Sequence, residues 1–144
     1  MGSKTGIYIF LAIALVLAGG LIWFVNRPHV EAAAAPLSSD AKAYVRNLQL
    51  SDVTMKATES YVGQTVTEIE GKIANAGSRT VEHVEVTCVF YNSFGEVILR
   101  ERVPIVVTGL KPGETRAFRM PFDAIPSGWN NQMPQLVIAR IEFA

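Results

Sequence analysis

Residues 6–25 form one uninterrupted apolar run, GIYIFLAIALVLAGGLIWFV, without a charged residue. As an α-helix, a run of this length spans about 30 Å, which matches the hydrocarbon core of a bilayer. A cleaved signal peptide is the alternative, because the alanines at 32–35 partly imitate a cleavage site, but its apolar part is shorter. We therefore expect a retained transmembrane helix with its tail (1–26), a linker (27–43) and a folded domain (44–144).

The charges that flank the apolar run predict its orientation. Lys4 and the terminal amine precede the run, whereas Arg27 is the basic residue that closely follows it. Basic residues favour the cytoplasmic side of a membrane. The sequence thus predicts a single-pass protein of the inner (cytoplasmic) membrane, with the N-terminus in the cytoplasm and the C-terminal domain periplasmic or extracellular.

Small residues inside the run bear on helix packing. Ala14 and Ala18 have small-xxx-small spacing, and Gly19 and Gly20 lie beside them. This spacing permits close approach of a second membrane helix. Small residues also occur in membrane helices without partners, so a helix partner and a lone helix are equally compatible with the pattern.

Beyond the linker, hydrophobic residues recur at every second position, most clearly in residues 81–92, VEHVEVTCVFYN. Val84, Val86, Cys88 and Phe90 fall on one face there, as in a half-buried strand. Clusters of Gly, Pro, Asn and Ser separate six such runs, which predicts an antiparallel β-sandwich. The predicted strands are 45–55, 65–74, 81–92, 96–108, 115–122 and 135–143.

Two residues predict local features of the domain. Pro104 lies within a strand pattern and lacks a backbone donor, so its strand belongs at a sheet edge or carries a bulge. Asp40 is a candidate N-cap for a short helix at the end of the linker.

Three runs, EGKIANAG, VEHVEVTCVFYNSFGEVI and LKPGETRAF, resemble the FxLYD domain and related bacterial domains of unknown function. Cys88 and Phe90 stand at the Phe and Leu positions of the naming motif, Tyr91 is retained, Asn92 replaces Asp, and Gly95 follows at the expected spacing. The resemblance implies an immunoglobulin-like sandwich on an exported or membrane-anchored protein. Because these motifs are turns and core positions, the resemblance implies a fold rather than a reaction.

The candidates for chemistry favour a chain that is not an enzyme. Cys88 shares its face with valines and is expected to be a buried, inert thiol. His29 and His83 are far apart in the sequence and lack neighbours at ligand spacing. We therefore predict no catalytic, cofactor-binding or metal site. The chain carries 13 Lys and Arg and 13 Asp and Glu, which gives no general attraction to nucleic acid.

The candidate protein-interaction residues are large apolar side chains in predicted connections. If every connection reverses the chain, those after the first, third and fifth strands lie together at the end far from the membrane. Large apolar groups in exposed turns usually mark contact surfaces. For Trp129 a core-capping role is the competing interpretation. The candidates are Tyr61, Phe94, Ile125, Trp129 and Met133.

The same count places Arg79 and Lys111 at the end near the membrane, where basic side chains suit anionic headgroups. These features favour a non-catalytic accessory or scaffold subunit of a larger membrane complex, such as a respiratory or photosynthetic one. Its partners would be the bilayer and other membrane-protein subunits. The alternative is a free-standing module of the cell envelope that binds a peptide, a glycan or an envelope component.

Overall fold

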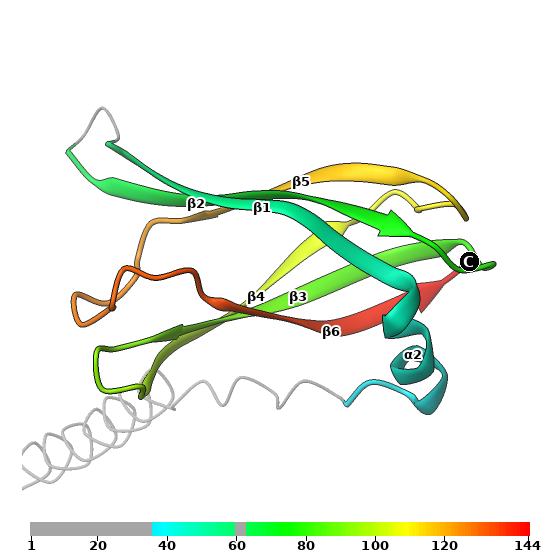
Figure 1. The fold of residues 1–144 in the computed structure, drawn as a ribbon, viewed down its shortest axis with the longest axis horizontal. Helices are drawn as coiled ribbons and strands as arrows, with labels where there is room; N and C mark the ends of the chain where they lie inside the picture. Colours follow the sequence, from blue (N-terminus) through cyan, green and yellow to red (C-terminus); the bar gives the residue numbers. More distant parts are fainter. Residues whose placement is uncertain (1–35, 60–62) are drawn as a thin grey trace, which may run out of the picture. The chain divides into compact units, whose positions relative to one another are not determined.

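The structure is a computed structural model that describes residues 36–59 and 63–144 (Figure 1). Among these residues, no helix is both long and apolar enough to cross a membrane. The predicted membrane helix, with Ala14, Ala18, Gly19 and Gly20, lies outside the described residues, as does Tyr61. The described elements are α2 (Ser39–Tyr44), the 3₁₀ turn η1 (Val45–Asn47), β1 (Leu48–Glu59), β2 (Thr65–Asn75), β3 (Val81–Tyr91), β4 (Val97–Val106), β5 (Thr115–Phe122) and β6 (Gln135–Phe143).

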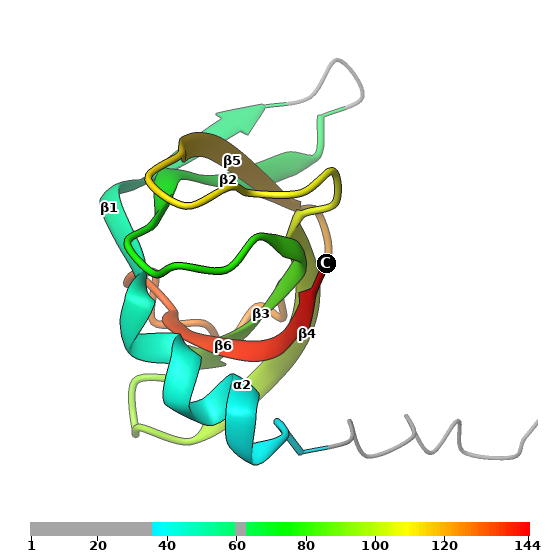
Figure 2. The ribbon, with the colours of Figure 1, turned by 90° about the vertical axis from the view of Figure 1, so that its right-hand side faces the viewer.

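The six strands form two three-stranded antiparallel sheets, with orders β1-β2-β5 and β4-β3-β6. Viewed end-on, the two sheets lie face to face and form a sandwich (Figure 2). The prediction of an antiparallel β-sandwich with six strands is therefore confirmed. The first strand begins at Leu48 rather than at 45, because α2 and η1 occupy the residues before it.

The core lies between the sheets and follows the alternation in the sequence. Val84, Val86, Cys88 and Phe90 are fully buried on the inner face of β3, as predicted. Burying an aliphatic or aromatic side chain of this size stabilises a fold by about 1.5–3 kcal/mol relative to exposure. The inner face of β3 therefore contributes much of the driving force for closing the sandwich. The opposite sheet contributes Ile69, Ile73, Phe118, Met120 and Phe122.

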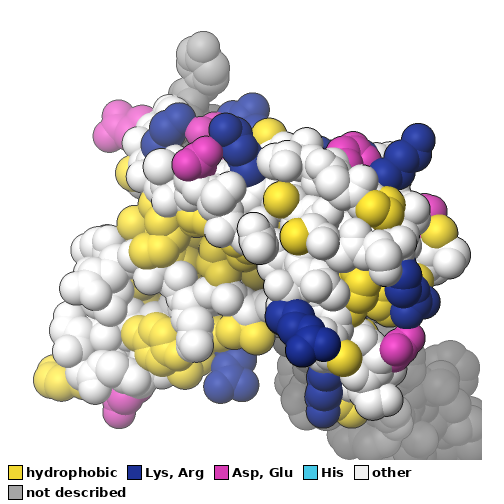
Figure 3. Space-filling view, turned by 45° about the vertical axis from the view of Figure 1, so that its right-hand side comes forward, with side chains coloured by type: hydrophobic (Ala, Val, Ile, Leu, Met, Phe, Trp, Pro, Cys, Tyr) yellow, Lys and Arg dark blue, Asp and Glu magenta, His cyan; other side chains and the backbone are white. Residues whose placement is uncertain are grey.

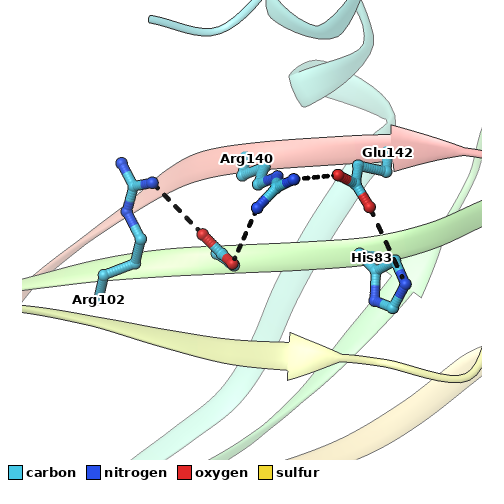
Figure 4. A network of polar contacts seen from close by, with 5 residues as sticks. His83, Arg102, Arg140 and Glu142 are labelled. Atoms are coloured by element: carbon cyan, nitrogen blue, oxygen red, sulfur yellow. Dashed lines mark hydrogen bonds and ion pairs between the residues drawn. The ribbon is translucent and has the colours of Figure 1, made fainter. Parts of the chain in front are cut away.

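Charged side chains cover the outer faces of both sheets. On the first sheet, Lys56 lies 2.7 Å from Glu70 and Arg119 lies 2.7 Å from Glu68. On the second sheet, an ion-pair network joins Arg102, Glu85, Arg140, Glu142 and His83 across three strands (Figure 4). Exposed ion pairs are individually weak. Because basic and acidic side chains alternate on each outer face, both faces are solvated surfaces with little net charge.

Pro104 meets both of its predicted conditions. Its strand, β4, is an edge strand of the β4-β3-β6 sheet. The register with β3 also shifts there, because Val84 faces Val106 while Glu85 faces Pro104. The edge position and the bulge accommodate a residue that has no backbone donor.

The N-cap prediction for Asp40 is wrong. Ser38 is the N-cap of α2, and its Oγ accepts a hydrogen bond from the backbone N of Ala41 at 3.2 Å. Asp40 lies in the first turn, where its carboxylate is 2.7 Å from Arg79 Nη1. The serine hydroxyl is correctly placed because a cap side chain bonds the amide of the third residue after it. The compact unit accordingly includes α2 and begins at Pro36.

Asn75 connects three segments at this end of the sandwich. Its Oδ1 accepts hydrogen bonds from Tyr44 Oη (2.8 Å) and Gly77 N (3.1 Å). Its Nδ2 donates to the carbonyl oxygens of Arg79 (2.8 Å) and Leu110 (3.0 Å). The Tyr44 hydroxyl in turn accepts from Arg79 N at 3.1 Å. One buried amide therefore fixes α2 and two turns to each other.

Candidate functional site

The connections of the sandwich are sorted into two ends. The β3–β4 connection (92–96) and the β5–β6 connection (123–134) lie together (Figure 1, left), joined by a bridge between Asn92 and Trp129. We call these two segments the loop end. The β2–β3 and β4–β5 connections lie at the opposite end, where Val81 pairs with Leu110. The predicted sorting is therefore confirmed for these four connections.

Phe94 is the most prominent apolar side chain of the loop end. It is 89% exposed at the tip of the β3–β4 turn. Asn92 Oδ1 accepts from the backbone N atoms of Phe94 and Glu96, each at 2.9 Å, and Asn92 Nδ2 donates to the Glu96 carboxylate at 2.7 Å. Gly95 completes the turn with a φ of 80°. The aromatic ring thus projects from a backbone that side-chain hydrogen bonds hold in place.

Trp129 and Ile125 point inward instead. The Trp129 ring meets Phe90 edge-on, with the ring centroids 5.7 Å apart, and Ile125 packs partly buried against the core. Trp129 Nε1 is buried and has no hydrogen-bond partner among the described residues. These contacts agree with the core-capping interpretation of Trp129.

The loop end also has a hollow and a second exposed apolar side chain. The hollow has a volume of about 280 Å³ and lies beside the inward-facing pair, Ile125 and Trp129. Met133, in the same connection, is exposed. Of the predicted interaction residues, Phe94 and Met133 are therefore accessible to a partner, and Ile125 and Trp129 line a recess. The recess is also lined by Thr65, Thr67, Phe122 and Asp123.

The two basic residues predicted for the opposite end differ in their environment. The Arg79 guanidinium pairs with Asp40 and lies 3.6 Å from the centre of the Phe143 ring. It therefore holds α2 against the sandwich, although 45% of the Arg79 side chain is exposed, and its contact with anionic headgroups stays a prediction. Lys111 is exposed and lines a hollow of about 630 Å³.

This second hollow has mixed charge. Arg116 donates to the Glu114 carboxylate at 2.6 Å and to Thr108 Oγ1 at 2.9 Å. A hydrogen bond from Lys111 N, followed by that from Arg116, holds the pKa of Glu114 below its usual value. With Glu82 on its wall as well, the hollow has no marked preference for an anion or a cation.

The described residues include no group of three His, Cys, Asp or Glu side chains that could hold a metal ion. Burial raises the pKa of Cys88 to about 12, so its thiol is neutral at physiological pH. Only a thiolate is a good nucleophile. The His83 side chain lies on an open sheet face, 3.9 Å from Glu142, rather than in a cavity.

Comparisons with known proteins do not identify a family for this chain. No family model matches the chain, and no curated protein does either. A crystal structure of the ApaA protein from Bordetella pertussis is similar at 20% identity, with a TM-score of 0.41, over 67% of this chain and 90% of that one. A likeness this low supports no inference about function. The resemblance to FxLYD domains stays a prediction.

Two residues were not singled out from the sequence, one buried polar residue and one exposed apolar residue. Asn75 falls in one of the Gly, Pro, Asn and Ser clusters between predicted strands, but its amide is buried and connects three segments. The second residue is Val137, an exposed apolar residue on β6. The signal for Val137 was present, because residues 135–139, QLVIA, contain no charge.

Proposed function

We propose that this chain is a non-catalytic, single-span membrane protein whose exported, immunoglobulin-like sandwich is an accessory subunit of a larger membrane complex. The membrane part rests on the uncharged apolar run at 6–25. The sheet order supports the immunoglobulin-like assignment: β5 returns to pair with β2, and β6 returns to pair with β3 across the sandwich.

The exposed ring of Phe94 is the observation that carries the proposal. An isolated exposed apolar residue is ordinary, but this one occupies a turn that Asn92 holds in place through three hydrogen bonds. A preorganised aromatic side chain loses little entropy when it enters a pocket on a partner. Burying the ring there contributes about 1.5–3 kcal/mol, which corresponds to roughly 10- to 150-fold in affinity.

The experiment compares two exposed apolar side chains at opposite ends. Full-length chain is purified from its own membranes in mild detergent, as wild type, as Phe94→Ser and as Val107→Ser. Val107 is also exposed, but it belongs to the β4–β5 connection. We expect partner subunits to co-purify with the wild type and with Val107→Ser, and to be depleted from Phe94→Ser. Full stoichiometry in Phe94→Ser contradicts the proposal.

The recess beside Trp129 favours a second candidate function, a binding module of the cell envelope. Its 280 Å³ suits a small ligand, and the buried indole N–H beside it has no partner among the described residues. Under this alternative the detergent-purified chain is alone, and Trp129→Phe, which removes the donor and keeps a ring, weakens ligand binding without unfolding the domain.

A further inference from the structure

The recess at the loop end lies where three segments of the chain meet. Thr67 of β2 and Phe122 of β5 are direct partners in the sheet, and both are buried. The β5–β6 connection adds Ile125 and Trp129, which are partly buried. The recess therefore has a largely apolar interior, and the polar residues that line it are exposed and form a rim. These rim residues are Thr65, Asp123, Ser127 and Asn131.

Backbone hydrogen bonds hold the β5–β6 connection in place. Trp129 N donates to the carbonyl oxygen of Pro126 at 3.1 Å, which closes a turn. Asn130 N donates to the carbonyl oxygen of Tyr91 at 3.0 Å, and Asn92 forms a bridge with Trp129. The connection is thus fixed to the end of β3, so little conformational entropy is lost when a ligand enters the recess.

The charges around the recess disfavour an anionic ligand. Among the described residues that line it, none is basic, and Asp123 contributes a carboxylate. Desolvation raises the pKa of Glu101, and the negative charge of nearby Asp123 raises it further. Figure 3 shows acidic and basic side chains interspersed on the face that it draws, so no broad basic surface there attracts anions.

We propose that the recess binds one uncharged sugar ring of a glycan, an inference that rests on the second candidate function and names its ligand. A pyranose ring carries C–H groups on its faces and hydroxyl groups around its edge. The C–H groups suit the electron-rich face of an aromatic side chain such as Trp129. The hydroxyl groups both donate and accept, as do the hydroxyl and amide groups of the rim, and they can donate to the Asp123 carboxylate. An ammonium ion only donates, so it would leave the donors of the rim unused.

The size of the recess limits its contents to one ring. Its volume of about 280 Å³ is just below the range of about 300–1,000 Å³ that is typical for drug-sized ligands. Because the rim is exposed, neighbouring sugars of a chain can continue into solvent. The larger hollow at the opposite end is lined by Lys111 and Arg116 and by no aromatic side chain among the described residues, so we expect no sugar there.

Titration calorimetry of the full-length chain tests the assignment, in a detergent without a sugar headgroup. The probes are four uncharged tetrasaccharides, of glucose, galactose, mannose and N-acetylglucosamine. Trigalacturonate is the anionic comparison, and a capped, uncharged Gly-Ser-Gly-Ser peptide is the comparison without a sugar ring. We expect at least one tetrasaccharide to bind with a Kd of about 1 mM or lower, because one small ring gives modest affinity. Trigalacturonate should bind roughly tenfold more weakly, because of the Asp123 charge.

Two substitutions in the recess and one outside it locate the binding. Asp123→Asn keeps the size of the side chain and removes its charge, whereas Trp129→Phe keeps a ring and removes the N–H donor. Each should weaken sugar binding by roughly five- to tenfold, and Asp123→Asn should also reduce the discrimination against trigalacturonate. Phe94→Ser is the control, because Phe94 is exposed at the same loop end but does not line the recess, and it should bind sugar like the wild type.

Absence of binding by all four tetrasaccharides overturns the proposal, as does sugar binding that neither substitution in the recess weakens. Protection of the buried Cys88 from thiol reagents shows that each variant is folded. If Trp129→Phe unfolds, Asp123→Asn alone decides, because Asp123 is exposed. Binding of the peptide or of trigalacturonate in place of the tetrasaccharides overturns the sugar assignment but leaves a binding module, whereas absence of binding by every probe counts against both.

Discussion

Asn75→Ala removes the amide that connects α2 to the turns beside it. Asn75 is 1% exposed, and its side chain makes four hydrogen bonds. Alanine leaves the amide of Gly77 without its partner, whereas the carbonyl of Leu110 still accepts from Val81 N at 3.0 Å and Tyr44 Oη keeps its contacts with Arg79. The perturbation therefore acts on groups that are buried or partly buried in the folded state.

The expected cost follows from those lost contacts. A donor left unpaired costs about 1–3 kcal/mol, and this applies to the Gly77 amide. The three other hydrogen bonds of the Asn75 side chain contribute about 0.5–1.5 kcal/mol each, so we expect a total loss of about 3–5 kcal/mol. Domains of this size have a total stability of about 5–15 kcal/mol. With a urea dependence of about 2 kcal/mol per M, the unfolding midpoint falls by about 2 M.

The measurement is urea denaturation of the full-length chain in mild detergent, followed by far-ultraviolet circular dichroism. Asn92→Ala is the control, because Asn92 also bonds backbone amides, but its hydrogen bonds are exposed. Water can replace them, so we expect that control to lose about 1 kcal/mol. Equal midpoint shifts for the two variants would refute the argument that burial, rather than the number of hydrogen bonds, sets the cost.

Two further predictions concern single residues of the domain. Gly77→Ala should destabilise the domain, because a Cβ added at Gly77 would collide with the hydroxyl and ring of Tyr44. Gly128→Ala should leave the melting temperature unchanged, because a Cβ added there meets nothing within 4 Å. Equal melting temperatures of the two variants would contradict this packing. Burial raises the pKa of Cys88 from 9.0 to about 12, so the unfolded thiol ionises first as the pH rises. Between about pH 9 and 12, wild type should therefore lose stability relative to Cys88→Ala, by about 1.4 kcal/mol per pH unit at most. A pH-independent difference in unfolding free energy between the two proteins would contradict the burial of the thiol.

Local patterns in the sequence determined the strands and their faces. A strand alternates with period two whatever its neighbours are, so Val84, Val86 and Cys88 could be assigned to the core before any pairing was known. Turn residues marked the reversals, and counting reversals placed Phe94 and Trp129 at the same end. The edge position of the strand with Pro104 could also be predicted, because proline lacks a backbone N–H in any fold.

Only the tertiary structure decided what depends on residues far apart in the chain. Asn75 accepts a hydrogen bond from Tyr44 and donates one to Leu110, and these bonds span 31 and 35 positions of the chain. The sequence of the turn around Asn75 does not predict them. Sheet order, likewise, left β6 with one neighbour among the described strands and thereby turned the uncharged stretch around Val137 into an open edge. Alternation reports which way a side chain faces but not which strand lies beside it, because pairing is settled by the packing of all six strands together.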